Sequence, residues 1–204
     1  MANERKEIEL IILTSLITTF SIASHIISFN IYSFNNFVFI PSSITYMLVI
    51  ALLDYSSVYY SRRLVISMIV IESLSNAMLF CLIKGSFIYN ISSLSPIADS
   101  LKNILLYFEK MYLANIVGTL IALLINNYIF TFFFKKTNFL TSSFISSTIF
   151  ILLYTPATDF IAFHDVVDLK NKNLISFNII TNMISFLIWS LSLNSLIKWR
   201  RKND

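Results

Sequence analysis

Charged side chains are scarce in this sequence. Asp, Glu, Lys and Arg make up 13% of its 204 residues, whereas about a quarter of the residues in an average soluble domain carry charge. Hydrophobic residues account for 56% of the chain. This composition excludes a water-soluble globule and favours a membrane protein. In lipid, long continuous apolar runs satisfy their backbone hydrogen bonds most simply as helices, and the alternating ten-residue pattern of a barrel is not found. The sequence therefore predicts an all-α integral membrane protein.

The residue types that build most catalytic and metal sites are also scarce. The chain has one cysteine, Cys81, two histidines and two glycines. A single thiol excludes a disulfide within the chain, and two imidazoles leave little from which to build a zinc site. Two glycines exclude a glycine-rich phosphate loop, and no Gly-x-Ser-x-Gly segment is present. We therefore expect neither an enzyme nor a protein that holds a metal or a cofactor.

Six windows of about 20 residues contain few charges and predict six transmembrane helices. They cover residues 8–29, 37–57, 64–83, 113–134, 140–163 and 174–197. The connections between them are too short for a separate soluble domain. We therefore expect residues 1–204 to form a single transmembrane domain embedded in a lipid bilayer.

The distribution of basic residues predicts the orientation. With both termini in the cytoplasm, ten of the fifteen Lys and Arg residues lie inside and five outside. The inner residues are Arg5, Lys6, Arg62, Arg63, Lys135, Lys136, Lys198, Arg200, Arg201 and Lys202, and the outer ones are Lys84, Lys102, Lys110, Lys170 and Lys172. Because Lys and Arg in short loops resist translocation, this asymmetry predicts a multi-pass inner-membrane protein with cytoplasmic termini. The net charge of +4 is then a result of topology and gives no reason to expect a nucleic-acid partner.

The one long connection, residues 85–112, contains a second helical pattern. Ser95 and Pro96 form a typical helix start. Apolar residues then recur at helical spacing with charged residues between them, which predicts an amphipathic helix. This helix either lies on the outer membrane surface or forms an early, tilted start of the fourth span.

Ionisable residues inside a span are costly and often functional. Four fall within the predicted spans: His25, Asp54, Glu72 and Asp159. Glu72 lies near the middle of the third span, where it serves either a substrate or proton role or an interhelical hydrogen bond. Asp54 either lies on a substrate path or pairs with the nearby Arg62 and Arg63.

The fifth span is interrupted by Pro156, which lies within the segment Tyr-Thr-Pro-Ala-Thr-Asp at residues 154–159. Proline frees a backbone carbonyl, and the neighbouring side chains add oxygens, as in the interrupted helices that line transporter sites. The fourth and sixth spans add amide groups that can point inward, from Asn126, Asn127, Asn178 and Asn182.

Several segments follow one another in an informative order. They read IASHII at 22–27, proline at 41, LLDYSSVY at 52–59, TLIALLINN at 119–127, STIF at 147–150 and FIAF at 160–163. Together they resemble the queuosine precursor transporters of the vitamin uptake transporter family, which read approximately I-A-S-K-I-V, Phe-Pro, T-D-x-x-S-E-V-Y-G and S-L-I-A-Y-L-I-G-Q in the same order. The resemblance covers most of the chain and implies a six-span importer of 7-cyano-7-deazaguanine, 7-aminomethyl-7-deazaguanine or queuine.

Two polar residues of the family have counterparts in this chain, and other polar residues of the family do not. Asp54 matches the family aspartate, and Asn127 stands where the family has glutamine. The family glutamate before Val-Tyr-Gly is absent, because Ser57 runs directly into Val58, and Phe130 takes the place of the aspartate in the fourth span. Thr155 aligns with the aspartate of the fifth span, and the lysine of the sixth span falls near Thr181. Asp159 lies four residues after Thr155, about one helical turn away on a similar face.

The chemistry of a deazaguanine base indicates how these residues would bind it. Its edge presents an N–H and an amino group side by side, which a buried carboxylate can accept together. Aromatic rings such as those of Tyr46, Tyr154 or Trp189 can stack on the flat base, and the amides can meet its carbonyl. The expected substrate-binding residues are Tyr46, Asp54, Glu72, Asn127, Thr155, Asp159 and Asn178.

Two other functions remain open at this point. The chain could be the membrane-embedded substrate-binding subunit of an ATP-driven vitamin uptake system, or a structural membrane protein without transport activity. A structural protein would lack an inward-facing polar cavity. The composition is also compatible with a homo-oligomer.

Overall fold

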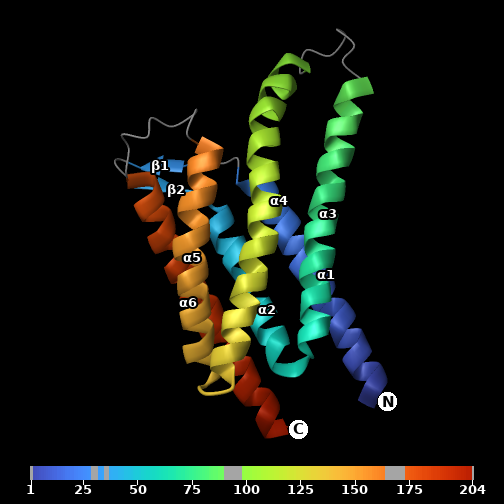
Figure 1. The fold of residues 1–204 in the computed structure, drawn as a ribbon, viewed down its shortest axis with the longest axis vertical. Helices are drawn as coiled ribbons and strands as arrows, with labels where there is room; N and C mark the ends of the chain where they lie inside the picture. The colour runs from blue at the N-terminus through green and yellow to red at the C-terminus, as the bar shows by residue number, and fades with distance from the viewer. Residues whose placement is uncertain (1, 29–31, 35–36, 90–97, 164–172, 204) are drawn as a thin grey trace.

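The computed structural model of the chain describes residues 2–28, 32–34, 37–89, 98–163 and 173–203. Within these ranges the chain forms six helices and one two-stranded antiparallel sheet (Figure 1). The elements are α1 (Ala2–Ile27), β1 (Tyr32–Phe34), β2 (Phe37–Phe39), α2 (Ser42–Tyr59), α3 (Arg62–Tyr89), α4 (Ala98–Phe134), α5 (Phe139–Phe163) and α6 (Asn173–Asn203). The predicted helical architecture is confirmed.

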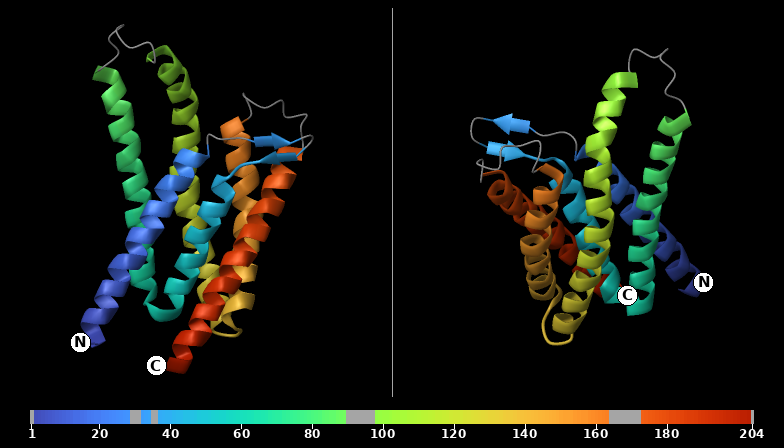
Figure 2. Two further views of the ribbon diagram at one scale, coloured as in Figure 1. Left: turned by 180° about the vertical axis from the view of Figure 1, so that it is seen from behind. Right: turned by 45° about the horizontal axis from the view of Figure 1, so that its top comes forward.

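Helix α2 lies at the centre of the bundle. It contacts each of the other five helices, and 11 of its 18 residues are buried. The left view of Figure 2 shows α2 between α1 and α6. Its middle reads Met-Leu-Val-Ile-Ala-Leu-Leu at 47–53 and is apolar on every face, as expected of a helix surrounded by protein.

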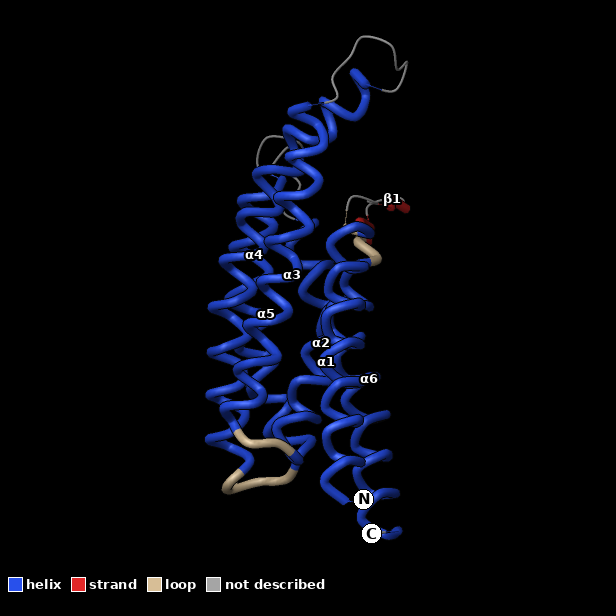
Figure 3. Tube along the Cα trace, turned by 90° about the vertical axis from the view of Figure 1, so that its right-hand side faces the viewer, coloured by secondary structure: helices blue, strands red, loops and turns tan. Residues whose placement is uncertain are grey.

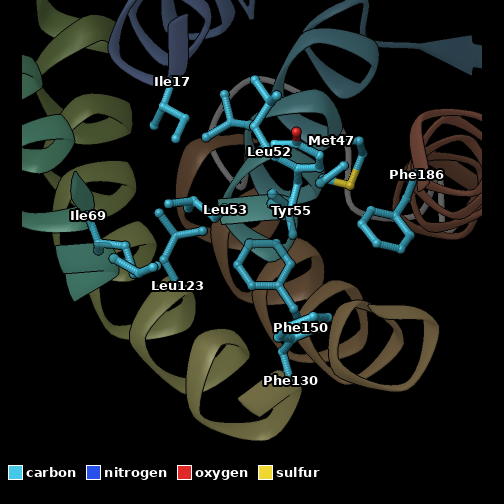
Figure 4. Packing of buried hydrophobic residues seen from close by; sticks show 14 of the residues in the cluster. Ile17, Met47, Leu52, Leu53, Tyr55, Ile69, Leu123, Phe130, Phe150 and Phe186 are labelled. Carbon is cyan, nitrogen blue, oxygen red and sulfur yellow. The ribbon is translucent and has the colours of Figure 1, made fainter. Parts of the chain in front are cut away.

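The buried side chains of all six helices meet around α2 (Figure 4). Fully buried members include Ile17, Leu53, Ile69, Leu123 and Phe150. Many large apolar side chains instead lie on the outside of the bundle, whereas numerous Ser, Thr and Asn side chains are buried inside. An apolar exterior around a partly polar interior is the arrangement expected of helices surrounded by lipid.

Four helical segments are long and apolar enough to cross a membrane: Glu4–Ile27, Arg62–Gly85, Phe139–Ile161 and Leu174–Asn203. They correspond to the first, third, fifth and sixth predicted spans. Gly118–Phe134 of α4 is a shorter apolar segment. The described residues thus support a membrane-embedded helical protein, while the full set of six spans and their orientation stay predictions.

The second predicted span begins later than expected. Phe37–Phe39 is strand β2, in which Phe39 pairs with Tyr32 of β1, and α2 begins only at Ser42. Pro41 precedes the helix. Proline disfavours helical backbone in the residue before it and has no N–H to donate, so it separates the apolar strand from the apolar helix. The uninterrupted apolar pattern of residues 37–57 concealed this boundary.

Helix α4 is continuous from Ala98 to Phe134. The amphipathic pattern from Ala98 onward therefore belongs to the same helix as the fourth predicted span, and no separate helix is found in the described part of this connection. The place of this helix relative to the membrane stays a prediction. The predicted start at Ser95 and Pro96 lies outside the described residues. Helices α3 and α4 extend beyond the rest of the bundle at the end opposite the termini (Figures 1 and 3).

Both chain ends lie at one end of the bundle, together with the α2–α3 and α4–α5 connections (Figure 1). At this end a cluster that we call the terminal clasp joins α1, α2 and α6. The Arg200 guanidinium donates to both Glu9 carboxylate oxygens, and its Nη2–Oε2 distance is 2.9 Å. It also donates to the Tyr55 hydroxyl at 3.3 Å and lies 4.3 Å from the centre of the Tyr59 ring. The hairpin β1–β2 lies at the other end, where β2 contacts α6.

Candidate functional site

A polar cavity lies between α1, α2, α5 and α6, near the end of the bundle that carries the hairpin. The volume open to the centres of water-sized spheres is about 70 Å³, and the space that also counts the open mouth and the solvent in it is about 550 Å³. The residues that line it are Ser24, His25, Ser28, Ile40, Ser42, Ser43, Tyr46, Met47, Tyr154, Thr155, Thr158, Asp159, Asn178 and Asn182. A concave site with a few converging polar groups is the usual form of a small-molecule site.

Asp159 supplies the carboxylate of this cavity. The Asn178 amide donates to Asp159 Oδ2 at 2.8 Å, and the Ser43 hydroxyl donates to Asn178 Oδ1 at 2.7 Å. This chain joins α5, α6 and α2. One helical turn further along α6, the Asn182 amide donates to the Thr155 hydroxyl at 3.0 Å. Within the described part of the chain Asp159 accepts from Asn178 alone, so Oδ1 has acceptor capacity for a ligand.

Aromatic rings form another wall of the cavity. Tyr46 and Tyr154 are stacked, with ring centres 5.9 Å apart and an interplanar angle of 24°. The His25 ring lies 6.2 Å from that of Tyr46. Both His25 Nε2 and Tyr46 Oη are buried without a hydrogen bond of acceptable geometry, although the Thr119 hydroxyl is close to Tyr46. Since buried polar atoms nearly always have partners, these two atoms are candidates for contact with a ligand.

Asp54 belongs to a different polar cluster, formed by α2, α4, α5 and α6. Asn126 donates to its Oδ1 at 3.0 Å and Ser143 to its Oδ2 at 2.5 Å, while Ser190 donates to the Ser143 hydroxyl. The expected pairing with Arg62 or Arg63 is wrong. Both arginines are exposed, and the Arg62 guanidinium lies over the Tyr128 ring. Asp54 instead points into the interior of the bundle.

Glu72 forms a third cluster, between α1 and α3. Its Oε1 accepts from Ser21 and, at 2.9 Å, from the Asn76 amide, and its Oε2 accepts from Ser73 at 3.0 Å. Asn76 also donates to the Ser21 hydroxyl at 2.9 Å. The Glu72 side chain is completely buried but does not line the cavity.

The seven predicted site residues therefore fall into separate groups. Tyr46, Thr155, Asp159 and Asn178 line one cavity, as expected of a shared site. Asp54 and Asn127 do not: Asn127 donates to the Ser57 hydroxyl at 2.8 Å, away from the cavity wall. Glu72, the seventh predicted residue, lies in its own cluster between α1 and α3 and does not line the cavity. The polar segment around Pro156 does line the cavity, through Tyr154, Thr155, Thr158 and Asp159.

Sequence reasoning missed several residues of the cavity wall. Asn182, one helical turn after Asn178, was expected to point inward but was left out of the predicted site residues. Ser43 carries no comparable signal, because serine is frequent throughout the chain and only the packing of α2 against α6 brings it to Asn178. His25 was considered only as an isolated ionisable residue, since nothing in the sequence places it beside Tyr46.

The arrangement suits binding better than covalent chemistry. Asp159 and the amides offer acceptors and donors, and the tyrosines offer flat surfaces, whereas no group of three or more His, Cys, Asp or Glu residues that could hold a metal ion occurs among the described residues. Cys81, the single thiol, is exposed on α3 away from the cavity. Comparisons with protein-family models, with curated proteins and with solved structures gave no match to this chain.

Proposed function

We propose that this chain is a membrane transporter that imports a queuosine precursor, a 7-deazaguanine base, across the inner membrane. The observation that carries the proposal is the polar cavity inside an apolar bundle, with one carboxylate and two stacked tyrosines in its wall. A structural membrane protein has no need of such a cavity. The order of the segments that resemble the queuosine precursor transporters supplies the identity of the base.

In this proposal Asp159 accepts the N–H and amino groups at the edge of the base. Asn178 donates to Asp159 Oδ2 at 2.8 Å, which holds the carboxylate in position and leaves Oδ1 for the ligand. The Tyr46 and Tyr154 rings provide apolar faces for the bicyclic ring. His25 Nε2 and Tyr46 Oη, both without a partner in the described structure, would meet the polar atoms on the opposite edge.

The proposed orientation places both termini in the cytoplasm. Arg62, Arg63, Lys135 and Lys136 belong to the connections at the same end of the bundle as the termini, so the basic end is a single surface, as the positive-inside rule requires. The cavity then lies toward the outer side. A reporter active only outside the cytoplasm should give no signal when fused to the C-terminus, and strong activity would reverse the orientation.

Uptake of labelled deazaguanine bases tests the function. Cells that lack an importer of their own should accumulate the base when they express the chain. Asp159→Asn should lower uptake about 5- to 150-fold, because a donor replaces one acceptor and leaves a buried group unpaired, a cost of about 1–3 kcal/mol. Glu7→Gln is the matched control, since it makes the same carboxylate-to-amide change at an exposed residue that does not line the cavity, and it should change uptake far less.

A second assay separates a transporter from a binding subunit. The purified chain in proteoliposomes without ATP should exchange labelled for unlabelled base. Binding of the base without exchange would favour the substrate-binding subunit of an ATP-driven system. Neither binding nor exchange of any of the three bases would contradict the proposed function.

A further inference from the structure

The Glu72 carboxylate lacks a cationic partner. Its hydrogen bonds come from Ser21, Ser73 and Asn76, all neutral donors, and no Lys, Arg or His of the described structure pairs with it. Glu72 lies ten residues after Arg62, the first residue of a candidate span, which is about 15 Å along a helix axis. The carboxylate is therefore deep in the apolar layer.

A charge in that position has to be neutralised. Ionised carboxylates in hydrocarbon are tolerated when they face protein and find a counter-ion, and otherwise they take up a proton. The neighbours of Glu72 are arranged as donors, with an amide nitrogen and two hydroxyls directed at its two oxygens. Such a shell suits the ionised form of the carboxyl and does not present the converging oxygens that a metal cation needs.

The Glu72 cluster also communicates with the cavity. Tyr46 of α2, Tyr112 of α4 and Tyr154 of α5 are close enough to Glu72 to interact with its charge. The His25 ring of α1 lies 6.2 Å from that of Tyr46 and 5.3 Å from that of Tyr112. His25, Tyr46 and Tyr154 line the cavity, and Tyr112 contacts the His25 ring. Asn76 is 1% exposed, and its Oδ1 has no hydrogen-bond partner. If the amide rotates, Oδ1 can accept a hydrogen bond from the O–H of a protonated Glu72.

We propose that Glu72 is a proton-binding site whose occupancy is coupled to ligand in the cavity, so that one proton and one base cross the membrane together. This inference rests on the proposed transport function. Proton uptake forms an O–H bond on Glu72 and removes the buried negative charge, and release to water on the other side breaks that bond. Tyr46 and Tyr154 transmit the change, because both line the cavity and experience the charge of Glu72, while Tyr112 reaches the cavity wall through the His25 ring.

Infrared difference spectra of the purified protein test the proton site without any transport. Exposed carboxyl groups are ionised at both pH 6 and pH 9, since their pKa is about 4. The wild type should show a protonated-carboxyl band at the lower pH that Glu72→Gln lacks. Asp54→Asn and Asp159→Asn, which alter the other two buried carboxylates, should keep it. A wild-type spectrum without any band that depends on Glu72 would overturn the proposal.

Proteoliposomes test the coupling, with the uncharged 7-cyano base as the probe. A pH about one unit higher inside should let the wild type concentrate the base up to about tenfold, the limit for one proton per base. Glu72→Gln should only equilibrate the base, while exchange of labelled for unlabelled base stays at the wild-type rate. Glu7→Gln, the same carboxylate-to-amide change at an exposed residue of α1, is the control and should still concentrate it. Concentration by Glu72→Gln to the wild-type level would refute coupling.

A milder variant keeps the test decisive if Glu72→Gln does not fold. Ser73→Ala removes one donor from Glu72 Oε2 and leaves the other two, so the pH at which driven uptake is half-maximal should move upward. An unchanged pH profile would contradict the proposal. If the wild type moves no base at all, the proposed function fails, while the infrared result still decides whether Glu72 binds a proton.

Discussion

The terminal clasp should contribute measurably to the stability of the bundle. The side chains of Arg200 and Glu9 are only 25% and 26% exposed, so this ion pair is intermediate between a fully exposed pair and a buried one. Exposed ion pairs contribute about 0.2–1 kcal/mol, and breaking a buried pair costs about 3–5 kcal/mol. For this bidentate, quarter-exposed pair we expect a coupling free energy of about 1–2 kcal/mol. Arg200 also lies over the Tyr59 ring, which adds about 0.5–1 kcal/mol to its removal alone.

A double-mutant cycle measures this coupling. Glu9→Gln, Arg200→Gln and the double variant are compared with the wild type by reversible unfolding in mixed micelles at low salt, with Glu7→Gln as an exposed control of equal charge change. Arg200→Gln should be the more damaging single variant. The coupling should shrink as NaCl is raised from about 0.05 to 0.5 M, because partly exposed charges are screened. A coupling below about 0.3 kcal/mol, within the error of simple additivity, would refute the reasoning.

Three further outcomes follow from other contacts. Ser143→Ala removes the donor 2.5 Å from Asp54 Oδ2 and should lower the free energy of unfolding by about 1–3 kcal/mol, measured by the same unfolding assay; a neutral result would mean that water or another group replaces the hydroxyl. Gly118→Ala should be tolerated, because its added Cβ would meet α5 side chains at 3.6 Å, an ordinary contact, whereas Gly118→Leu should lower thermal stability by separating α4 from α5. Burial and the charge of Glu9 raise the pKa of Tyr60 to about 12, so the absorbance titration of its phenolate should move to lower pH in Glu9→Gln; an unmoved titration would mean that Glu9 does not reach Tyr60.

Hydrophobic runs predicted the helices well, because burial of apolar surface in lipid depends on residue type and length alone. Boundaries were predicted less well wherever two apolar elements adjoin. Residues 37–39 are as apolar as the helix that follows, and only the backbone restriction around Pro41 separates them. Hydropathy contains no term for such a restriction, which is why a strand was read as the start of a span.

The candidate site was partly predictable for a different reason. Asp159 and Thr155 lie on similar faces of one helix, so periodicity could place them together. Ser43 and Asn178 are 135 residues apart, and only the packing of α2 against α6 brings them into contact. Asp54 shows the converse: Arg62 is near in sequence, yet its true partners are Asn126 and Ser143 on α4 and α5. A single sequence does not specify which helices will be neighbours.

The central place of α2 also affects how the protein is made. Asp54 finds its two donors 72 and 89 residues later in the chain, which at about 5–20 residues per second is an interval of roughly 4–18 s. During that interval the Asp54 carboxylate of α2 lacks both of these donors. Its 18 residues also span only about 27 Å, less than the hydrocarbon thickness of about 30 Å. Helix α2 therefore reaches the contacts seen in the folded bundle only after α4 and α5 have been synthesised.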